Sequence, residues 1–343
     1  MKHRKKLQVE VMELKGKMYE IGRKQGITLK TNAKWKQQTG LQPIGDMREA
    51  RKQIEKVSPS LLNEIEGLAA GMNIHVDTAM QLFGGYNIQM PSMGCTALAN
   101  DSLYVRNYDF SEALYDARLV LLNSDNGYAS IGFSQQIIGR LDGMNEKGLV
   151  IGLHLVNEKI SQKGFLATTI CRLVLEQCAD INEAISLIKQ VPHQYCVNFS
   201  IMDREGNNAV VEVSPAQQIV CKRTPLICTN HFESKQLNEK NRAYIQGSLH
   251  RKNYLEALEK ENVTPISAYH IFNDEESPLF FKDYKEYFGT LHTVVYCPKD
   301  RSVVVGIGGN GDPYFLSFND WLKGKEKLPC ILAGEIASGS FLC

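Results

Sequence analysis

Cys95 is the residue of this sequence whose setting best suits nucleophilic chemistry. It follows Gly94 and a loop-like stretch that starts at Pro91, and strand-like segments begin there. A glycine at this point allows a strained or positive-φ backbone. If the peptide bond before Cys95 is cut, an α-amine with a reference pKa of about 7.7–8.0 lies beside a thiol with a reference pKa of about 8.5. The amine can then accept the thiol proton, so no histidine base is needed. The alternative is a small buried residue at the start of a strand.

Asn230, Arg106 and Asp109 are further polar residues whose positions suit a catalytic site. Asn230 follows the apolar run Pro225–Cys228. An amide at the end of a strand can donate a hydrogen bond to a developing oxyanion, or it can cap the strand through an Asx turn. Arg106 and Asp109 are three residues apart, so a regular strand places them on opposite faces. A surface ion pair is the alternative for these two residues.

Six short motifs occur in a definite order along the chain. They are Met93-Gly94-Cys95-Thr96, Val105-Arg106-Asn107-Tyr108-Asp109-Phe110, Asp142-Gly143-Met144-Asn145-Glu146-Lys147-Gly148-Leu149, Val210-Val211-Glu212-Val213-Ser214-Pro215, Cys228-Thr229-Asn230-His231-Phe232 and His292-Thr293-Val294-Val295-Tyr296. This ordered set resembles the N-terminal-nucleophile hydrolases and is most similar to the fungal acyl-CoA:6-aminopenicillanic-acid acyltransferase family. Choloylglycine hydrolases, penicillin V acylases and acid ceramidase-type amidases are the wider relatives. The resemblance extends over nearly the whole chain.

The resemblance implies an α+β fold, a four-layer αββα sandwich in which two antiparallel sheets lie between helical layers. It also implies self-cleavage between Gly94 and Cys95. Residues 1–94 are then a helical N-terminal segment that becomes the first subunit, residues 95–343 form the catalytic region, and the two together make one domain. Choloylglycine hydrolases have only a very short leader, so the long segment here favours the acyltransferase branch.

The same resemblance assigns roles to individual side chains. It implies that Asp109 holds the new ammonium group, that Arg106 favours the thiolate and that Asn230 donates to the oxyanion. A second oxyanion donor is expected on the strand after the third motif, where the bile-salt branch has an asparagine and this chain has His154. A neutral histidine can donate a hydrogen bond; the alternative is a satisfied core histidine. Arg251 resembles a late arginine of the relatives, and its alternative is a solvated helix charge.

The elements expected from hydrophobic periodicity come in runs rather than in strict alternation. The first ninety residues are predicted to be helical, with helices at Met47–Val57, after Ser58 and at Asp77–Phe83. Later helices are expected at Phe165–Gln177, Ile181–Lys189 and Tyr244–Lys260. Strands are expected at Thr96–Leu98, Leu103–Tyr108, Arg118–Leu122, Tyr128–Phe133, Leu149–Leu155, Cys196–Met202, Ala209–Val213, Ile219–Lys222, Leu226–Thr229, Leu291–Cys297 and Ser302–Ile307. Such runs favour antiparallel sheets covered by helices.

The composition is typical of a soluble globular protein, with 43% apolar and 22% charged residues among 343. The 39 Lys and Arg residues nearly balance the 38 Asp and Glu residues, so we expect no nucleic-acid partner. No window approaches 18 uninterrupted apolar residues, so no membrane span is expected. The charged start of the chain is not followed by an apolar core, which argues against a signal peptide.

The cysteines and glycines argue against cofactor and metal sites. The nine cysteines include no C-x-x-C pair, which favours a reducing cytoplasm over a disulfide framework or a zinc site. The run Gly306–Gly311 fits G-x-G-x-x-G, but Asp312 and Pro313 follow it where a dinucleotide site needs a helix. We therefore interpret it as a loop, some of whose glycines line the substrate pocket, and expect no cofactor and no metal.

These observations predict a self-processing cysteine enzyme that acts on a linear amide C–N bond through a thioester acyl-enzyme. Its partner is a small-molecule N-acyl amide or acyl donor. Hydrolysis and acyl transfer both remain open, as does homo-oligomerisation. The alternative from a different class is a catalytically inert scaffold or binding protein that has kept the fold.

Overall fold

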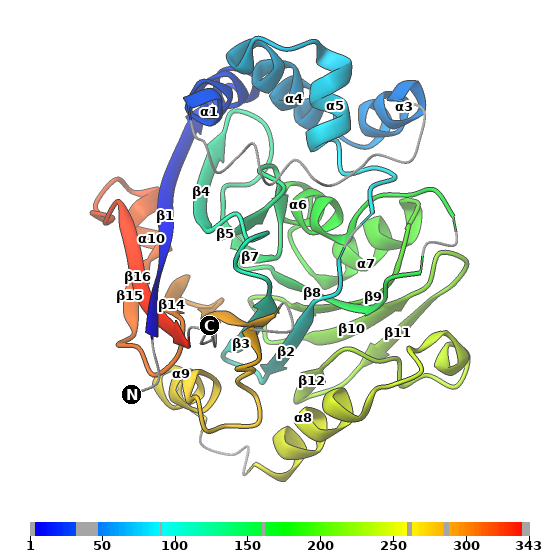
Figure 1. The fold of residues 1–343 in the computed structure, drawn as a ribbon, viewed down its shortest axis with the longest axis vertical. Helices are drawn as coiled ribbons and strands as arrows, with labels where there is room; N and C mark the ends of the chain where they lie inside the picture. Colours follow the sequence, from blue (N-terminus) through cyan, green and yellow to red (C-terminus); the bar gives the residue numbers. More distant parts are fainter. Residues whose placement is uncertain are drawn as a thin grey trace, which may run out of the picture.

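Two β-sheets form the centre of the computed structural model, which describes residues 4–31, 47–89, 91–159, 162–258, 263–284 and 288–337 (Figure 1). The longer sheet contains β1 (Arg4–Gly16), β4 (Arg118–Ser124), β5 (Ser130–Gln135), β6 (Gly139–Arg140), β7 (Asp142–Asn145), β8 (Val150–Asn157), β9 (Cys196–Met202), β10 (Asn208–Val213), β11 (Gln218–Lys222) and β16 (Ile331–Ala337). Their spatial order is β11-β10-β9-β8-β7-β5-β4-β1-β16, with β6 paired to β5. The shorter sheet contains β2 (Gly94–Ala99), β3 (Tyr104–Phe110), β12 (Leu226–Cys228), β13 (Gly289–Cys297), β14 (Ser302–Ile307) and β15 (Tyr314–Ser317), in the order β12-β2-β3-β13-β14-β15.

One group of helices covers the two sheets, and another group lies at one end of the structure. They are α1 (Met18–Thr31), α3 (Met47–Val57), α4 (Pro59–Met72), α5 (Val76–Phe83), α6 (Ala167–Gln177), α7 (Ile181–Gln190), the 3-10 helix η1 (Asn238–Lys240), α8 (Gln246–Ala257), α9 (Pro265–Asn273) and α10 (Phe318–Leu322). Helices α6 and α7 pack on the longer sheet, α8 and α9 pack on the shorter one, and the sheets contact each other through β2 and β8. The predicted αββα arrangement is therefore confirmed. Helices α1, α3, α4 and α5 lie together at one end (Figure 1).

The helix predicted after Ser58 is α4, and its predicted start is confirmed. The Ser58 side chain accepts a hydrogen bond from the backbone N–H of Leu61, and Pro59 occupies the first turn. At the other end, Asn73 adopts the left-handed conformation, with φ of 59°, that commonly ends a helix. Leu61 and Ile65 on this helix belong to the same hydrophobic cluster as residues of both sheets.

The prediction of helices throughout the first ninety residues is wrong for Arg4–Gly16, which form β1. In this segment Leu7 and Val9 are buried, whereas Gln8 and Glu10 are exposed. A period of two is typical of a half-buried strand. Strand β1 pairs antiparallel with β16 and parallel with β4, so the longer sheet is mixed rather than purely antiparallel.

Several elements were not predicted from the sequence: β6, β7, β15, β16, α9 and α10. Strands β6, β7 and β15 are two to four residues long, which is too short for a periodic pattern to be recognised. In the segments that the structure describes, no helix is long and apolar enough to cross a membrane.

The pairing of β2 with β3 determines which side chains meet Cys95. The two strands are antiparallel, with Cys95 opposite Tyr108, Ala97 opposite Arg106 and Gly94 opposite Asp109. Side chains alternate between the faces of a sheet. Cys95 and Arg106 therefore lie on one face of the shorter sheet, and Asp109 lies on the other.

Candidate active site

Cys95 is the second residue of β2 and is fully buried. Its Sγ atom accepts a hydrogen bond from Nη2 of Arg106 at 2.9 Å. Its backbone N–H donates to Oδ1 of Asn230 at 2.9 Å. The register between β2 and β3 produces the first contact, because Ala97 is on the same face as Cys95 and lies opposite Arg106. The thiol and the amide nitrogen of Cys95 thus each have a polar partner from another segment.

Arg106 is held in a buried ion pair. Its Nη1 donates to Oδ2 of Asp142 at 2.7 Å, and its Nη2 also donates to the carbonyl of Leu153 at 2.7 Å. Oδ1 of Asp142 accepts a hydrogen bond of 2.7 Å from the Tyr296 hydroxyl. Burial acts against the charged form of both partners. The neighbouring Cys95 and Asp142 nevertheless raise the pKa of Arg106, and Arg106 lowers the pKa of Asp142 below its usual range. Both partners are therefore charged.

Asp109 lies on the opposite face of β3 and packs against Gly94. A Cβ atom at residue 94 would lie 2.8 Å from Oδ2 of Asp109. Gly94 is not among the positive-φ glycines, so the close approach of Asp109, and not the backbone conformation, requires a glycine here. Oδ1 of Asp109 accepts from the Thr290 hydroxyl at 2.6 Å, beside a register shift between Thr290 and His292 in β13. Burial raises the pKa of Asp109, and the charge of Arg251 acts in the opposite direction.

Asn230 follows β12 and brings a side-chain amide to the backbone of Cys95. Besides the Cys95 N–H, its Oδ1 accepts from Nη2 of Arg251 at 2.8 Å. Its Nδ2 donates to the carbonyl of Leu155 at 2.9 Å, and its backbone N–H donates to the Ser248 hydroxyl at 2.8 Å. These bonds reach other segments, so the amide is not used as a cap on its own strand. Arg251 on α8 is only 8% exposed, which excludes a solvated helix charge.

His154 on β8 is fully buried beside the same site. Its Nε2 lies 2.8 Å from the Ser200 hydroxyl, and its Nδ1 has no hydrogen-bond partner in the described part of the chain. Burial and the positive charge of Arg106 lower the pKa of His154 well below its usual value, although the Cys95 backbone acts in the opposite direction. The imidazole is therefore neutral.

The thiol of Cys95 is protonated at neutral pH while residues 94 and 95 are joined. Burial raises the pKa of Cys95 to about 12. Arg106 and Arg251 act to lower it, and Asp109 and Asp142 act to raise it further. Because the thiolate is the nucleophilic form, a buried thiol with this pKa is a weak nucleophile.

Asp142, His292 and Tyr296 were not predicted as site residues, although all three lie within the motifs. His292 stacks on Phe133 with ring centroids 3.6 Å apart, and its Nε2 lies 3.4 Å from Oδ2 of Asp142. Its Nδ1 lies 2.8 Å from the Tyr115 hydroxyl. Asp142 opens the third motif and Tyr296 closes the last one, so both positions were visible as motif residues. Their contact depends on strands from the two different sheets, which no local pattern reveals.

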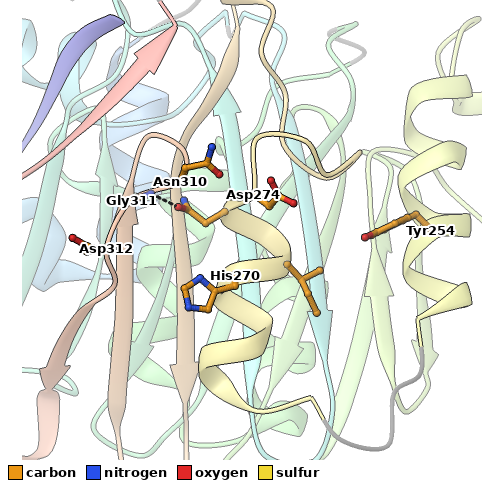
Figure 2. A pocket seen from close by; sticks show the side chains of 8 residues that line it. Tyr254, His270, Asp274, Asn310, Gly311 and Asp312 are labelled. Atoms are coloured by element: carbon orange, nitrogen blue, oxygen red, sulfur yellow. Dashed lines mark hydrogen bonds between the residues drawn. The ribbon is translucent and has the colours of Figure 1, made fainter.

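A cavity of about 540 Å³ lies on the outer side of the shorter sheet and is distinct from this site (Figure 2). Its lining includes Tyr254, His270, Asp274 and Gly311, and Cys95 is not among the lining residues. Gly311, from the last glycine-rich loop, lines this cavity and not the site around Cys95. Within the described ranges, no group of three or more His, Cys, Asp or Glu side chains is arranged to hold a metal ion.

Comparison with known proteins establishes the family. Residues 97–312 match the family described as acyl-coenzyme A:6-aminopenicillanic acid acyl-transferase. This match spans more than half of the chain, so the chain belongs to that family, as the order of the motifs predicts. A sequence comparison with curated proteins gives no match.

Several solved structures are similar at low identity. A variant of conjugated bile acid hydrolase from Clostridium perfringens is 15% identical, with 73% of this chain and 100% of that chain covered and a TM-score of 0.48. Penicillin V acylase from Agrobacterium tumefaciens is 13% identical, with coverages of 66% and 86% and a TM-score of 0.41. The Caenorhabditis elegans ortholog of N-acylethanolamine-hydrolyzing acid amidase is 11% identical, with coverages of 60% and 93% and a TM-score of 0.42.

Proposed function

We propose that this protein is a self-processing cysteine amidase or acyltransferase that acts on linear amides. One observation carries the proposal. The Cys95 thiol contacts a charged guanidinium, the Cys95 N–H contacts the Asn230 amide, and a carboxyl group lies against the preceding Gly94. These are the groups needed to activate a thiol, to hold the nitrogen of a scissile bond and to manage its proton. Membership in the acyltransferase family supports the same conclusion.

The first reaction is cleavage of the protein's own chain. Sγ of Cys95 attacks the carbonyl carbon of Gly94, the C–N bond between the two residues breaks, and the thiol proton passes to the leaving nitrogen. Asp109, whose pKa is raised by burial, lies against Gly94 and can carry that proton. Water then hydrolyses the resulting thioester. The products are a carboxylate on Gly94 and a free α-amine and thiol on Cys95.

Cleavage changes the chemistry of the nucleophile. The thiol that burial keeps protonated then has its own α-amine as a base. Oδ1 of Asn230, which accepts from the Cys95 N–H, becomes a partner for this amine. Asp109 adds a negative charge that favours its ammonium form. Arg106 remains beside Sγ and stabilises the thiolate.

The second reaction is attack of the Cys95 thiolate on the carbonyl carbon of an N-acyl substrate. The amine of the substrate leaves with a proton from the Cys95 ammonium, and a thioester acyl-enzyme forms. Water or an acceptor amine then takes the acyl group and releases the thiol. The oxyanion of each tetrahedral intermediate needs preorganised donors, and we assign the Nδ2 of Asn230 and the ring of His154 to this role.

A panel of N-acyl amides, N-acyl amino acids and peptides, assayed with and without acyl-acceptor amines, tests this function. The enzyme should release amine from at least one substrate class, and the Cys95→Ala variant should release none. If an added acceptor amine speeds up consumption of the substrate and a new acyl-amine product appears, the enzyme transfers the acyl group. If the rate stays the same and only the free acid appears, the enzyme hydrolyses the substrate. Equal activity of the wild type and Cys95→Ala would contradict the assignment.

A further inference from the structure

Asn230 lies in the segment Thr229–Ser234, which belongs to neither a helix nor a strand. Thr229, Asn230 and His231 are buried in it. Buried backbone N–H and C=O groups need hydrogen-bond partners, and a segment outside the sheets cannot take them from a neighbouring strand. The place of the Asn230 amide beside Cys95 therefore depends on the side chains that hold this backbone.

Asn198 on β9 binds the backbone on both sides of Asn230. The Asn198 side chain is 2% exposed, and its Nδ2 donates to the carbonyl of Thr229 at 3.3 Å and to the carbonyl of His231 at 2.8 Å. Its Oδ1 has no hydrogen-bond partner in the described part of the chain. Because a carbonyl group can only accept, these two carbonyls fix the orientation of the Asn198 amide. Asn198 thus holds the residue before Asn230 and the residue after it.

Glu212 on β10 binds the end of the same segment. The Glu212 side chain is 1% exposed, its Oε1 accepts from the backbone N–H of Glu233 at 2.6 Å, and its Oε2 accepts from that of Ser234 at 3.1 Å. A carboxylate only accepts hydrogen bonds, so it suits two neighbouring N–H groups. Glu212 belongs to the fourth motif, Val210–Pro215, and none of the contacts described above at Cys95 uses a residue of that motif.

The register of the longer sheet brings these two side chains next to the candidate active site. Glu212 is opposite Asn198 in the pairing of β10 with β9, and Asn198 is opposite His154 in the pairing of β9 with β8. Paired residues have their side chains on the same face of a sheet, so the three form one row. On its other side the segment is held by α8, where the Ser248 hydroxyl accepts from the Asn230 N–H at 2.8 Å.

We propose that Asn198 and Glu212 are positioning residues that hold the Thr229–Ser234 segment and, through it, place the Asn230 amide against the backbone N–H of Cys95. Both act on the reaction through Asn230 and not on the substrate. A catalytic group misplaced by about 1 Å can cost about 10² in rate. The expected effect on turnover rests on the proposed function, whereas the expected effect on the Cys95 N–H does not.

Hydrogen exchange at the amide of residue 95 tests the positioning without any activity, in a Cys95→Ala background that lacks the thiol. Glu212→Gln replaces a carboxyl oxygen by an NH2 group, so one backbone N–H of the segment loses its acceptor and the segment must shift. The exchange rate at residue 95 is divided by that of the slowest amides of the same variant, which report global unfolding. This ratio should rise about fivefold or more, as expected when a buried hydrogen bond is lost.

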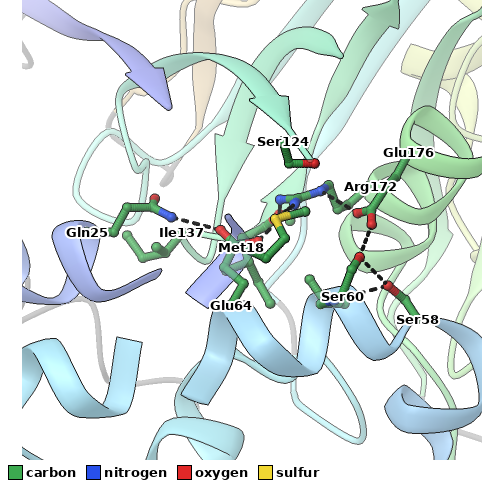
Figure 3. A network of polar contacts seen from close by, with 12 residues as sticks. Met18, Gln25, Ser58, Ser60, Glu64, Ser124, Ile137, Arg172 and Glu176 are labelled. Carbon is green, nitrogen blue, oxygen red and sulfur yellow. Dashed lines mark hydrogen bonds and ion pairs between the residues drawn. The ribbon is translucent and has the colours of Figure 1, made fainter. Parts of the chain in front are cut away.

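Glu176→Gln is the matched control for this measurement. Glu176 on α6 is also buried, but its carboxyl group accepts from Arg172 and Ser60 in the network of Figure 3, away from Cys95. Its replacement should leave the exchange ratio at residue 95 unchanged. Equal ratios for Glu212→Gln and Glu176→Gln would overturn the proposal, whether or not the protein cuts itself.

Turnover by the mature protein gives a second test. Glu212→Gln should lower kcat per cleaved molecule by about 10–10² with little change in KM, and Glu176→Gln should keep the wild-type kcat. In an Asn230→Ala background the Glu212→Gln change should have no further effect, because the amide that Glu212 positions is absent. Losses that multiply in the double variant would contradict the proposal. If the wild type turns over no amide, the proposed function fails, and the exchange ratio still decides the positioning.

Asn198→Ala takes the place of Glu212→Gln if the latter does not fold. This change removes both hydrogen bonds to the carbonyls of Thr229 and His231. The same rise in the exchange ratio at residue 95 is expected, together with the same loss of kcat that disappears in an Asn230→Ala background. An exchange ratio no higher than that of Glu176→Gln would rule out the positioning role.

Discussion

The Sγ atom of Cys95 lies 2.9 Å from Nη2 of Arg106, and Nη1 of the same guanidinium lies 2.7 Å from Oδ2 of Asp142. One buried arginine is thus shared between a thiol and a carboxylate. The carboxylate balances the charge of the arginine, and Nη2 donates to the sulfur and to the carbonyl of Leu153. This geometry leads to predictions about the reactivity, the maturation and the stability of the protein.

Replacing Arg106 by Met should make the Cys95 thiol harder to ionise. Arg106 lowers the pKa of this thiol, so its removal raises that pKa. An opposite charge at this distance typically shifts a pKa by about 1–3 units. In the mature protein, the rate of thiol alkylation at Cys95 should therefore rise with pH at a midpoint about 1–3 units higher than in wild type. Arg51→Met, which removes an arginine on the surface, should leave the midpoint unchanged. If the alkylation rates of Arg106→Met and wild type have the same pH dependence, Arg106 does not lower the pKa of the Cys95 thiol.

Gly94→Ala should slow self-cleavage strongly. The added Cβ would lie 2.8 Å from Oδ2 and 3.0 Å from Cβ of Asp109, so the carboxyl group must move away from the scissile bond. Gly247→Ala on α8 is the control, because the added Cβ would have no atom within 4 Å. Gel electrophoresis of samples taken over time measures the fraction of uncut chain. At each time this fraction should be higher than in wild type for Gly94→Ala, and equal to wild type for Gly247→Ala. Normal maturation of Gly94→Ala would show that the close packing has no role.

Asn230→Ala should lower kcat by about 10²–10³ with little change in KM, because a preorganised donor acts mainly in the transition state. The mutant should also accumulate precursor, since Oδ1 of Asn230 holds the Cys95 N–H at 2.9 Å. Activity is therefore measured per cleaved molecule, after quantification of the free N-terminal cysteine. Full activity per cleaved molecule, accompanied only by lower thermal stability, would assign Asn230 a purely structural role.

Asp142→Asn should destabilise the fold more than Tyr296→Phe. The first change leaves Arg106 buried without its carboxylate, and breaking a buried pair in this way typically costs about 3–5 kcal/mol. The second removes a single hydrogen bond of 2.7 Å to the charged Asp142, and a hydrogen bond to a charged group typically contributes about 1.5–3 kcal/mol. Urea denaturation of both variants in a Cys95→Ala background gives the two free energies of unfolding. Equal values for the two variants would mean that the charge of Asp142 is not needed.

The parts of the fold with strong local patterns were predictable from the sequence. The sequence of α4 contains both its cap residues and its apolar spacing. The Asp-Asn-Gly sequence before Tyr128 is typical of a tight turn, and it joins β4 to β5 with Gly127 at φ of 89°. Strand β1 also alternates, but its place between β4 and β16 depends on partners more than one hundred residues away. Its assignment to a helical segment failed because charged and apolar residues in a short run fit both periods.

The candidate site was predictable only as a set of ordered motifs. Cys95, Arg106 and Asn230 could be named from these motifs, and the structure brings them together. Asp142 has no local feature that distinguishes it from a turn residue, and its importance comes from three long-range partners. Arg251 was equally compatible with a solvated helix, and only the packing of α8 shows that it is buried. The spacing of residues along the chain does not reveal long-range contacts of this kind.

The mass of the purified protein under denaturing conditions tests the central claim most directly. Self-cleavage by Cys95 predicts two fragments, Met1–Gly94 and Cys95–Cys343, for the wild type and a single chain for Cys95→Ala. The attack requires a sulfur or oxygen nucleophile at residue 95 to form the ester-type intermediate, so Cys95→Ser should still be cut but at a lower rate. An active wild-type protein that remains one chain, or a Cys95→Ala protein cut at the same bond, would contradict this account.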